Sequence, residues 1–311
     1  MSAELKWSVA TGFVVVAAIF AAADNPTAQR QAFRRGVDLV SLSVTATNGN
    51  QRYVSDLTQD DFIVTENGVP QQVTFFAKSG VPLALALLID TSASMEPNLV
   101  TAQDAAIGFV RHIGPTDLAM IIEFNSGVHT AQTLTSDQHA LETAIRRTVA
   151  SGSTALYNAV YIALNELGKL SRDDPQTPRR RAIIVLSDGD DTSSLLGFDE
   201  VLDLASRSDT AIYAIGLGPP SSAPTTHNNQ DGPFVLRRLA QQTGGRAFFP
   251  LHIKELAAVY GDIREELSSQ YTLAYESNNT RHDGRWRRVA VDVSRAGVVV
   301  RTRPGYFAPA K

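Results

Sequence analysis

From Leu83 onward the chain alternates between short, continuously apolar runs and longer amphipathic segments. The runs LALALLI, LAMIIEF, AIIVL and AIYAIGL predict strands near residues 83–90, 117–124, 181–187 and 211–217, with a weaker strand near 246–249. Helical patterns fall near 98–112, 137–149, 155–170, 197–207, 233–242 and 253–268. A strand that is apolar at every position is covered on both faces, which is typical of parallel strands between two helical layers. The alternation therefore predicts a doubly wound α/β domain with a mostly parallel sheet.

Shorter β patterns flank this region on both sides. Residues 37–79 are predicted to form a β-rich flank: the chain alternates apolar and polar positions over Val37 to Val44, and the dipeptides Asn48-Gly49 and Asn67-Gly68 predict hairpin turns. The C-terminal segment, residues 263–311, returns to β patterns near 270–276, 285–293 and 297–303. Because the two ends of a domain often lie close together, we expect the two flanks to pack as one small β-sandwich.

The N-terminal segment has the features of an export signal. Lys6 is followed by an apolar run that ends in small residues just before Asp24. This pattern predicts a signal peptide over residues 1–23, followed by a flexible leader over residues 24–36. The run is short for a membrane span, but an uncleaved membrane anchor is an alternative. The protein is therefore predicted to be exported, either periplasmic or secreted, with no transmembrane span in the mature chain.

The composition excludes several functional classes. The 311 residues contain no cysteine, which excludes disulfides, thiol catalysis and zinc-thiolate sites. The net charge of −4 is too small to indicate nucleic acid as a partner. Neither a P-loop nor a G-x-S-x-G nucleophile motif occurs, and the six histidines are scattered. We therefore predict that the protein is not an enzyme.

Three loops at the predicted carboxyl-end rim of the sheet carry small oxygen-bearing side chains. Asp90 ends the first apolar run and precedes Ser92 and Ser94; Thr154 lies just before a helix, and Asp188 ends a later strand. Ligands of doubly wound sheets bind beyond this rim. Two carboxylates and three hydroxyls suit a hard cation such as Mg²⁺, which prefers oxygen ligands and keeps several waters. Each motif alone could be a helix cap or a turn, but the three together predict a divalent metal site.

This constellation resembles the metal-ion-dependent adhesion site of the von Willebrand factor type A domain. That family has Asp-x-Ser-x-Ser after the first core strand, Thr in a later loop and Asp at the end of the following core strand. Here DTSAS, GST and LSDG fill all five positions. The resemblance covers about residues 82–262. The flanks, with LTQDDFIVTENGVP before this region and RPGYFAP after it, resemble a group of exported bacterial proteins related to the family.

The resemblance implies adhesion or assembly in the cell envelope rather than catalysis. It implies that Ser92, Ser94 and Thr154 bind the cation directly, and that Asp90 and Asp188 act mainly through water. The expected cation is Mg²⁺, with Mn²⁺ or Ca²⁺ as alternatives, and the expected partner is a protein that offers Asp or Glu to the metal. Two other functions stay open, a metal-dependent hydrolase or phosphotransferase and a structural envelope module with an idle metal site. The sequence does not predict an oligomeric state.

Three further features have less specific interpretations. Residues 218–233 form a long loop that either rims the docking surface and helps to select the partner or is a flexible insertion. The run Arg179-Arg180-Arg181 is interpreted as a solvated edge before a strand. The tail from Ser277 to Lys311 holds seven arginines, most of which are expected to face outward from strands.

Overall fold

The structure of the protein is a computed structural model. It describes residues 39–78, 80–173, 178–188, 190–217 and 231–310. The predicted signal peptide, the leader and most of the loop 218–233 lie outside the described residues. Residues 36–311 belong to one structural unit. Within the described ranges, no helix has both the length and the apolar character needed to cross a membrane.

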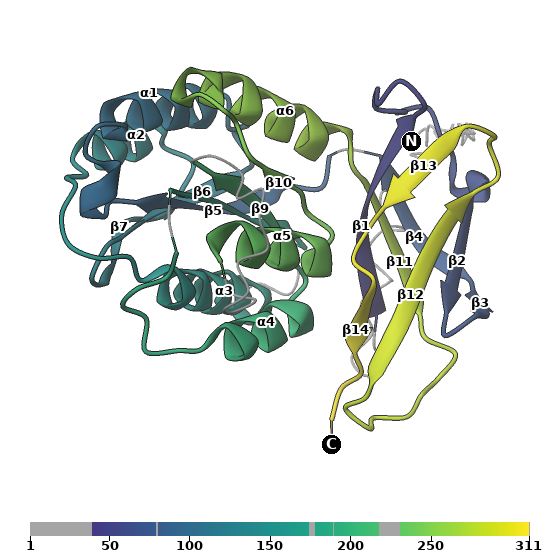
Figure 1. Cartoon of the computed structure of the whole chain (residues 1–311). Coiled ribbons are helices and arrows are strands. Elements are labelled where there is room, and N and C mark those ends of the chain that lie inside the picture. Colours follow the sequence, from purple (N-terminus) through teal and green to yellow (C-terminus); the bar gives the residue numbers. More distant parts are fainter. Residues whose placement is uncertain (1–38, 79, 174–177, 189, 218–230, 311) are drawn as a thin grey trace, which may run out of the picture. The chain divides into compact units, whose positions relative to one another are not determined.

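A six-stranded sheet forms the centre of the α/β part (Figure 1), with the strand order β10-β9-β8-β5-β6-β7. The strands are β5 (Leu83–Asp90), β6 (Leu118–Phe124), β7 (Val128–Thr135), β8 (Arg180–Ser187), β9 (Thr210–Gly216) and β10 (Ala247–Phe248). Neighbouring strands are parallel except β6 and β7, which are antiparallel. The five predicted strands are confirmed. Strand β7 was not predicted, because its sequence VHTAQTLT is largely polar and contains no continuous apolar run. In the structure this strand is only half-buried.

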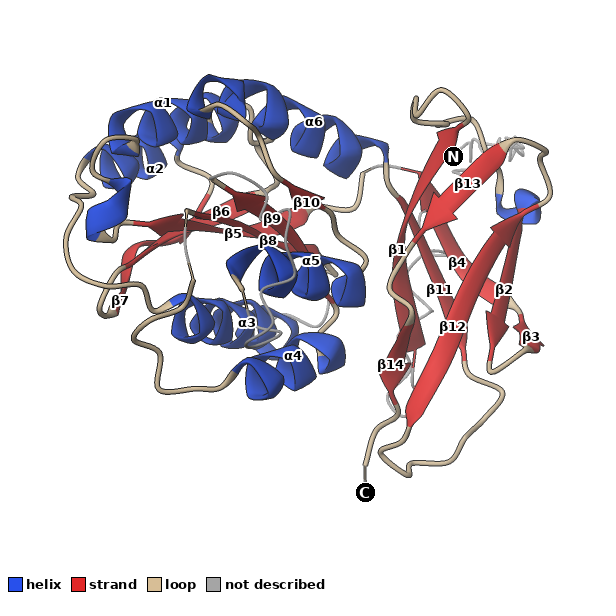
Figure 2. Ribbon diagram, in the orientation of Figure 1, coloured by secondary structure: helices blue, strands red, loops and turns tan. Residues whose placement is uncertain are grey.

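Helices cover both faces of this sheet (Figure 2). They are α1 (Leu99–Val110), α2 (Gln138–Arg146), α3 (Leu156–Asp173), α4 (Phe198–Arg207), α5 (Gly232–Thr243) and α6 (Leu256–Ser269). Along β5, Leu85 and Leu87 belong to the core formed with α1, α2 and α6, whereas Ala86 and Leu88 belong to the core formed with α3, α4 and α5. Successive side chains of a strand point to opposite faces, so a strand that is apolar throughout is buried on both. The doubly wound α/β fold is thereby confirmed.

The end of α5 approaches β9 so closely that glycine is required there. Gly244 ends the helix in the left-handed conformation, with φ of 79°. A Cβ atom at the next residue, Gly245, would lie 1.9 Å from the backbone oxygen of Ile212 in β9. Because β9 pairs with strands on both sides, its backbone cannot move away without loss of sheet hydrogen bonds.

Replacing Gly245 by alanine is therefore expected to lower the free energy of unfolding by about 3 kcal/mol, the upper end of the usual cost of overpacking. The matched control is Gly261→Ala in α6, where a Cβ atom would meet nothing within 4 Å. That change should leave stability equal or slightly higher, because alanine favours the helix. Denaturant unfolding of the two variants measures the difference, and equal midpoints would contradict the close packing of α5 on β9.

The two flanks build a β-sandwich of two four-stranded sheets, with the orders β13-β1-β11-β4 and β14-β12-β2-β3. Its strands are β1 (Leu39–Asn48), β2 (Phe62–Glu66), β3 (Val69–Gln71), β4 (Val73–Lys78), β11 (Tyr271–Glu276), β12 (Trp286–Val293), β13 (Val298–Arg301) and β14 (Gly305–Phe307). Strand β1 pairs with β11 and β13, and β2 pairs with β12. Each sheet thus takes strands from both flanks, which confirms the predicted sandwich.

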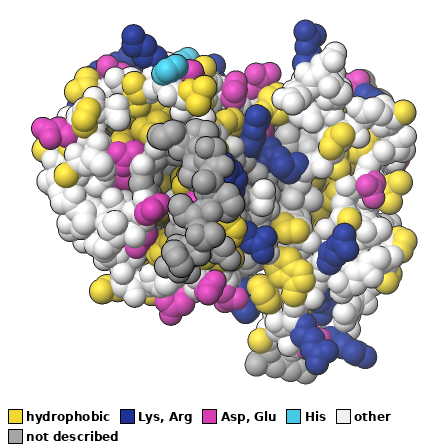
Figure 3. All heavy atoms as spheres, viewed as in Figure 1, with side chains coloured by type: hydrophobic (Ala, Val, Ile, Leu, Met, Phe, Trp, Pro, Cys, Tyr) yellow, Lys and Arg dark blue, Asp and Glu magenta, His cyan; other side chains and the backbone are white. Residues whose placement is uncertain are grey.

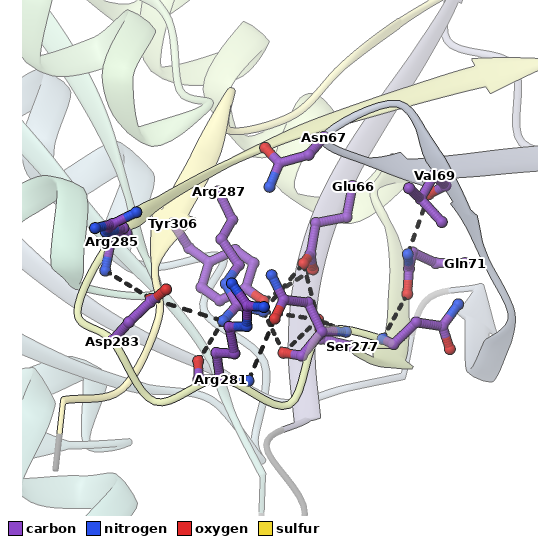
Figure 4. Close-up of polar contacts among 12 residues, drawn as sticks. Glu66, Asn67, Val69, Gln71, Ser277, Arg281, Asp283, Arg285, Arg287 and Tyr306 are labelled. Atoms are coloured by element: carbon purple, nitrogen blue, oxygen red, sulfur yellow. Dashed lines mark hydrogen bonds and ion pairs between the residues drawn. The ribbon is translucent and has the colours of Figure 1, made fainter.

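A buried ion pair lies inside the sandwich (Figure 4). Glu66 and Arg287 are only 2% and 3% exposed, and Arg287 Nη1 lies 3.3 Å from Glu66 Oε1. The carboxylate of Glu66 also accepts hydrogen bonds from the hydroxyls of Tyr275 at 3.0 Å, Tyr306 at 2.9 Å and Ser277 at 2.8 Å. Burial, and next the charge of Glu66, raise the pKa of Tyr275, so this phenol stays a hydrogen-bond donor. The carboxylate is therefore fully engaged by donors from β11, β12 and β14.

The guanidinium of Arg287 also organises the loop between β11 and β12, because it donates to the carbonyl oxygens of Asn279 and Arg281.

Four of the seven arginines in the tail from Ser277 to Lys311 are exposed, and Arg287 is the buried exception. In the space-filling view (Figure 3), several Lys and Arg side chains gather over the sandwich, and Asp and Glu side chains lie mostly over the α/β part.

A second polar cluster joins α6 to the sandwich. The carboxylate of Glu266, 1% exposed, accepts a hydrogen bond from the hydroxyl of Tyr213 at 2.7 Å and pairs with Arg301 at 2.5 Å. Gln270 Nε2 donates to the hydroxyl oxygens of Tyr213 at 2.9 Å and Thr45 at 3.3 Å. Burial, and next the charge of Glu266, raise the pKa of Tyr213 well above its usual value. These contacts connect β9 and α6 with β1 and β13.

Candidate metal site

Asp90 lies at the end of β5, and its side chain is fully buried. Both carboxylate oxygens accept hydrogen bonds: Oδ1 from the backbone N–H of Ser92 at 2.8 Å, and Oδ2 from the hydroxyl of Ser187 at 2.6 Å. Burial raises the pKa of Asp90, and the charge of Asp188 adds to this, whereas the bonds from the two serines oppose it. Among the described residues, no basic side chain forms an ion pair with Asp90. The site therefore contains a buried acid without a compensating cation from the protein.

Two serines connect Asp90 to Asp188. The hydroxyl oxygens of Ser92 and Ser94 lie 3.1 Å apart, and the Ser94 hydroxyl donates to Asp188 Oδ1 at 2.9 Å. A single 3-10 turn, η3 (Ala93–Met95), follows Ser92 and brings the two serine side chains together. Although 94 residues separate Ser94 from Asp188, the parallel pairing of β5 with β8 places them at the same edge of the sheet. Four of the five predicted site residues thus form one hydrogen-bonded chain.

The fifth predicted residue, Thr154, lies in a loop that is hydrogen-bonded to the two rim loops after Asp90 and Asp188. Thr154 is 5% exposed. Its backbone N–H donates to Thr192 Oγ1 at 2.9 Å, and its carbonyl oxygen accepts from the N–H of Thr192 at 2.9 Å. On the other side, the N–H of Ala93 donates to the carbonyl oxygen of Gly152 at 3.0 Å. Among the described residues, no hydrogen bond joins the Thr154 hydroxyl to the other four side chains.

Two neighbouring residues, Ser187 and Asp191, have structural roles outside the five predicted site residues. Ser187 precedes Asp188 at the end of β8 and holds Asp90 through its hydroxyl. Asp191 accepts hydrogen bonds from the N–H of Tyr157 at 3.2 Å and from the hydroxyl of Ser194 at 2.6 Å, so it caps the start of α3. The run of hydroxyls after Asp191, Thr-Ser-Ser, is the sequence signal that could have indicated a cap.

The chemistry of these side chains fits a hard divalent cation. Asp90 and Asp188 supply two carboxylates, and Ser92, Ser94 and Thr154 supply hydroxyls. No group of three or more His, Asp or Glu side chains in the described part of the chain is placed to hold a metal. An ion at this rim would therefore depend on hydroxyl oxygens and water, which Mg²⁺ accepts readily. A cation would also compensate the buried charge of Asp90.

Residues 85–190 match the family model of the von Willebrand factor type A domain. The matched segment contains all five residues of the predicted site. The chain therefore carries a von Willebrand factor type A domain, as the resemblance of its motifs indicated. Domains of this family commonly mediate metal-dependent protein interactions, and they are generally adhesion or assembly modules without enzymatic activity.

The chain is also similar to curated proteins and to solved structures. A UPF0353 protein of Mycobacterium tuberculosis is 25% identical over 199 residues, which cover 58% of this chain and 59% of that protein. The chain thus spans about three-fifths of the length of the curated relatives it matches. A von Willebrand factor type A structure from Catenulispora acidiphila has a TM-score of 0.53 at 12% identity, covering 90% of this chain and 76% of that chain. Proximal thread matrix protein 1 from the mussel byssus, with a zinc-occupied MIDAS motif, has a TM-score of 0.47 at 17% identity, covering 64% and 48%.

Proposed function

We propose that the protein binds a partner protein through a divalent cation, with Mg²⁺ the expected ion, at the carboxyl-end rim of the central sheet. The observation that carries this proposal is the hydrogen-bonded chain from Asp90 through Ser92 and Ser94 to Asp188, which contains a fully buried carboxylate that pairs with no basic side chain among the described residues. Such an arrangement of oxygen atoms is suited to a cation and to little else.

In this proposal the hydroxyls of Ser92, Ser94 and Thr154 are the direct ligands. Asp188 accepts a hydrogen bond from the Ser94 hydroxyl, so its charge makes the serine oxygen a better electron-pair donor toward a metal. Asp90 accepts from the backbone of Ser92 and so fixes the position of that residue. Because few anionic oxygens would contact the ion directly, it would keep a strong affinity for an incoming Asp or Glu carboxylate of the partner.

We further propose that the protein acts in the cell envelope, either in the periplasm or after secretion. The support is the N-terminal sequence, in which an apolar run after Lys6 ends in small residues before Asp24. Adhesion or assembly on that side of the membrane agrees with the class of domain that the chain carries.

The partner interaction is tested by affinity capture. Full-length protein, immobilised and loaded with Mg²⁺, is expected to retain at least one protein from an extract of the cell envelope and to release it when EDTA is added. The Ser92→Ala/Ser94→Ala variant should retain none of that protein. If the same protein binds equally well in EDTA and to the variant, the interaction does not use this site and the proposal is wrong.

A further inference from the structure

Arg180, at the start of β8, lies in an unusual environment. The interpretation of the run 179–181 as a solvated edge is wrong for this residue, which is half-buried. Its guanidinium donates to the backbone oxygens of Leu267 at 2.6 Å and Val81 at 3.2 Å, and to Gln270 Oε1 at 3.2 Å. All three acceptors are uncharged. Burial lowers the pKa of Arg180.

Little negative charge surrounds this guanidinium. Within the described ranges, no Asp or Glu forms an ion pair with Arg180. Asp117 is nearby, but its two oxygens accept the N–H groups of Leu83 at 2.7 Å and Gly114 at 3.3 Å. The carbonyl end of α6 adds roughly half an elementary negative charge. Burial of a cation is costly unless an anion compensates it, so a bound anion would stabilise Arg180 in this position.

A small cavity opens beside Arg180, with a volume of about 70 Å³. Its apolar wall includes Leu85 of β5, Phe109 at the end of α1 and Leu267 of α6. Two more basic side chains line it, Arg264 and His112. His112 Nδ1 is engaged by the backbone oxygen of Gly108 at 2.7 Å, which leaves its other ring nitrogen available.

The charge of the cavity lining is therefore positive on balance. Arg180 and Arg264 contribute two full charges, against the single carboxylate of Asp117 and the partial charge of the helix end. In the described part of the chain, the side chain of Arg264 forms no ion pair or hydrogen bond of its own. A ligand with one negative charge would complete the site.

The size of the cavity limits the ligand. A cavity of about 150 Å³ holds the six carbons of benzene, so 70 Å³ accommodates about three heavy atoms. The cavity lies at the amino ends of the strands, where β5 begins, whereas Asp90 ends that strand. Seven residues of extended chain correspond to roughly 23 Å, so this cavity is separate from the metal site.

We propose that the cavity binds a free short-chain monocarboxylate of the size of formate or acetate. The carboxylate pairs with Arg180 and Arg264, and the methyl group of acetate packs against Leu85 and Phe109. Two basic side chains and an apolar wall in so small a space match this class of ligand better than phosphate, which has no apolar part.

Calorimetric titration of formate and acetate into the full-length, metal-stripped protein tests this proposal. Ionic strength is held constant with chloride, and removal of metal prevents binding of the carboxylate at the other site. Both acids are expected to bind saturably with a stoichiometry of one. Benzoate should not bind, because its ring alone requires about twice the volume.

The variant Arg264→Gln is expected to weaken acetate binding at least about tenfold, since it removes one charged hydrogen-bond donor from the exposed side of the cavity. The matched control is Arg238→Gln, which makes the same charge change at an exposed position of α5 away from the cavity. Absence of saturable acetate binding, equal affinity of wild type and Arg264→Gln, or equal binding of benzoate would each overturn the proposal.

Discussion

Replacing Ser92 and Ser94 together by alanine is expected to abolish saturable binding of Mg²⁺ and Mn²⁺ to the metal-stripped protein, a loss of roughly 100-fold or more in affinity. The change removes two of the three proposed direct ligands. It also breaks the chain of hydrogen bonds that connects Asp90 with Asp188. Without the two hydroxyls, two carboxylates face one rim and nothing between them holds an ion in place. Isothermal titration calorimetry of wild type and variant measures the difference.

A second pair of serines on the same rim provides a matched control. The hydroxyl oxygens of Ser126 and Ser153 lie 2.9 Å apart in exposed loops, but neither is bonded to Asp90 or Asp188. The double variant Ser126→Ala/Ser153→Ala should bind metal as the wild type does. Equal loss in both double variants would indicate a general change in the rim loops rather than loss of ligands, and would contradict the assigned roles.

The same titration separates the alternative functions. If the wild type binds no metal, the rim is either idle or completed only by the carboxylate of a partner, and a purely structural module becomes the better account. A hydrolase or phosphotransferase would turn over generic phosphoesters in the presence of Mg²⁺. We expect no such turnover, since the chain carries a domain of a generally non-enzymatic family.

Replacing Arg287 by alanine is expected to lower the free energy of unfolding by about 3–5 kcal/mol, the usual cost of removing one partner from a buried ion pair. Glu66 would remain 2% exposed without its cation. The loop between β11 and β12 would also lose the two carbonyl contacts that the guanidinium makes. Denaturant unfolding followed by circular dichroism measures the loss.

The neighbouring arginine of β12 is the control for this prediction. Arg288 is exposed on the opposite face of the strand, so Arg288→Ala should change stability by no more than about 0.5 kcal/mol. The double variant Glu66→Gln/Arg287→Met should recover much of the loss, because it removes both charges and not one. Similar losses for Arg287→Ala and Arg288→Ala would show that the ion pair does not stabilise the sandwich.

The layers of the fold could be read from the sequence because they depend on local periodicity. LALALLI is apolar at every position, and the structure buries alternate residues of β5 in two separate cores. The rim residues Asp90, Ser92 and Ser94 could be placed for a related reason. They directly follow a strand whose direction in the sheet was already implied by the alternation of strands and helices.

Other features depended on contacts between distant segments, which no local pattern contains. Strand β7 forms only because its polar sequence finds an open edge beside β6. The position of Thr154 relative to the other four predicted site residues depends on a backbone bond from Ala93 to Gly152 and on the bonds between Thr154 and Thr192. Sequence alone could not provide that geometry.

The sequence by itself determined the order of the elements and the pairing of the two flanks, and it predicted which residues lie at the rim. Only the tertiary structure decided which charged side chains are buried and which groups surround them. Arg287 and Arg180 both occur in arginine-rich segments that look like solvated surface, yet one is paired with Glu66 and the other faces a cavity without a carboxylate partner. The physical reason is that periodicity encodes which side of an element is apolar, whereas the burial of a charge depends on what another element places against it.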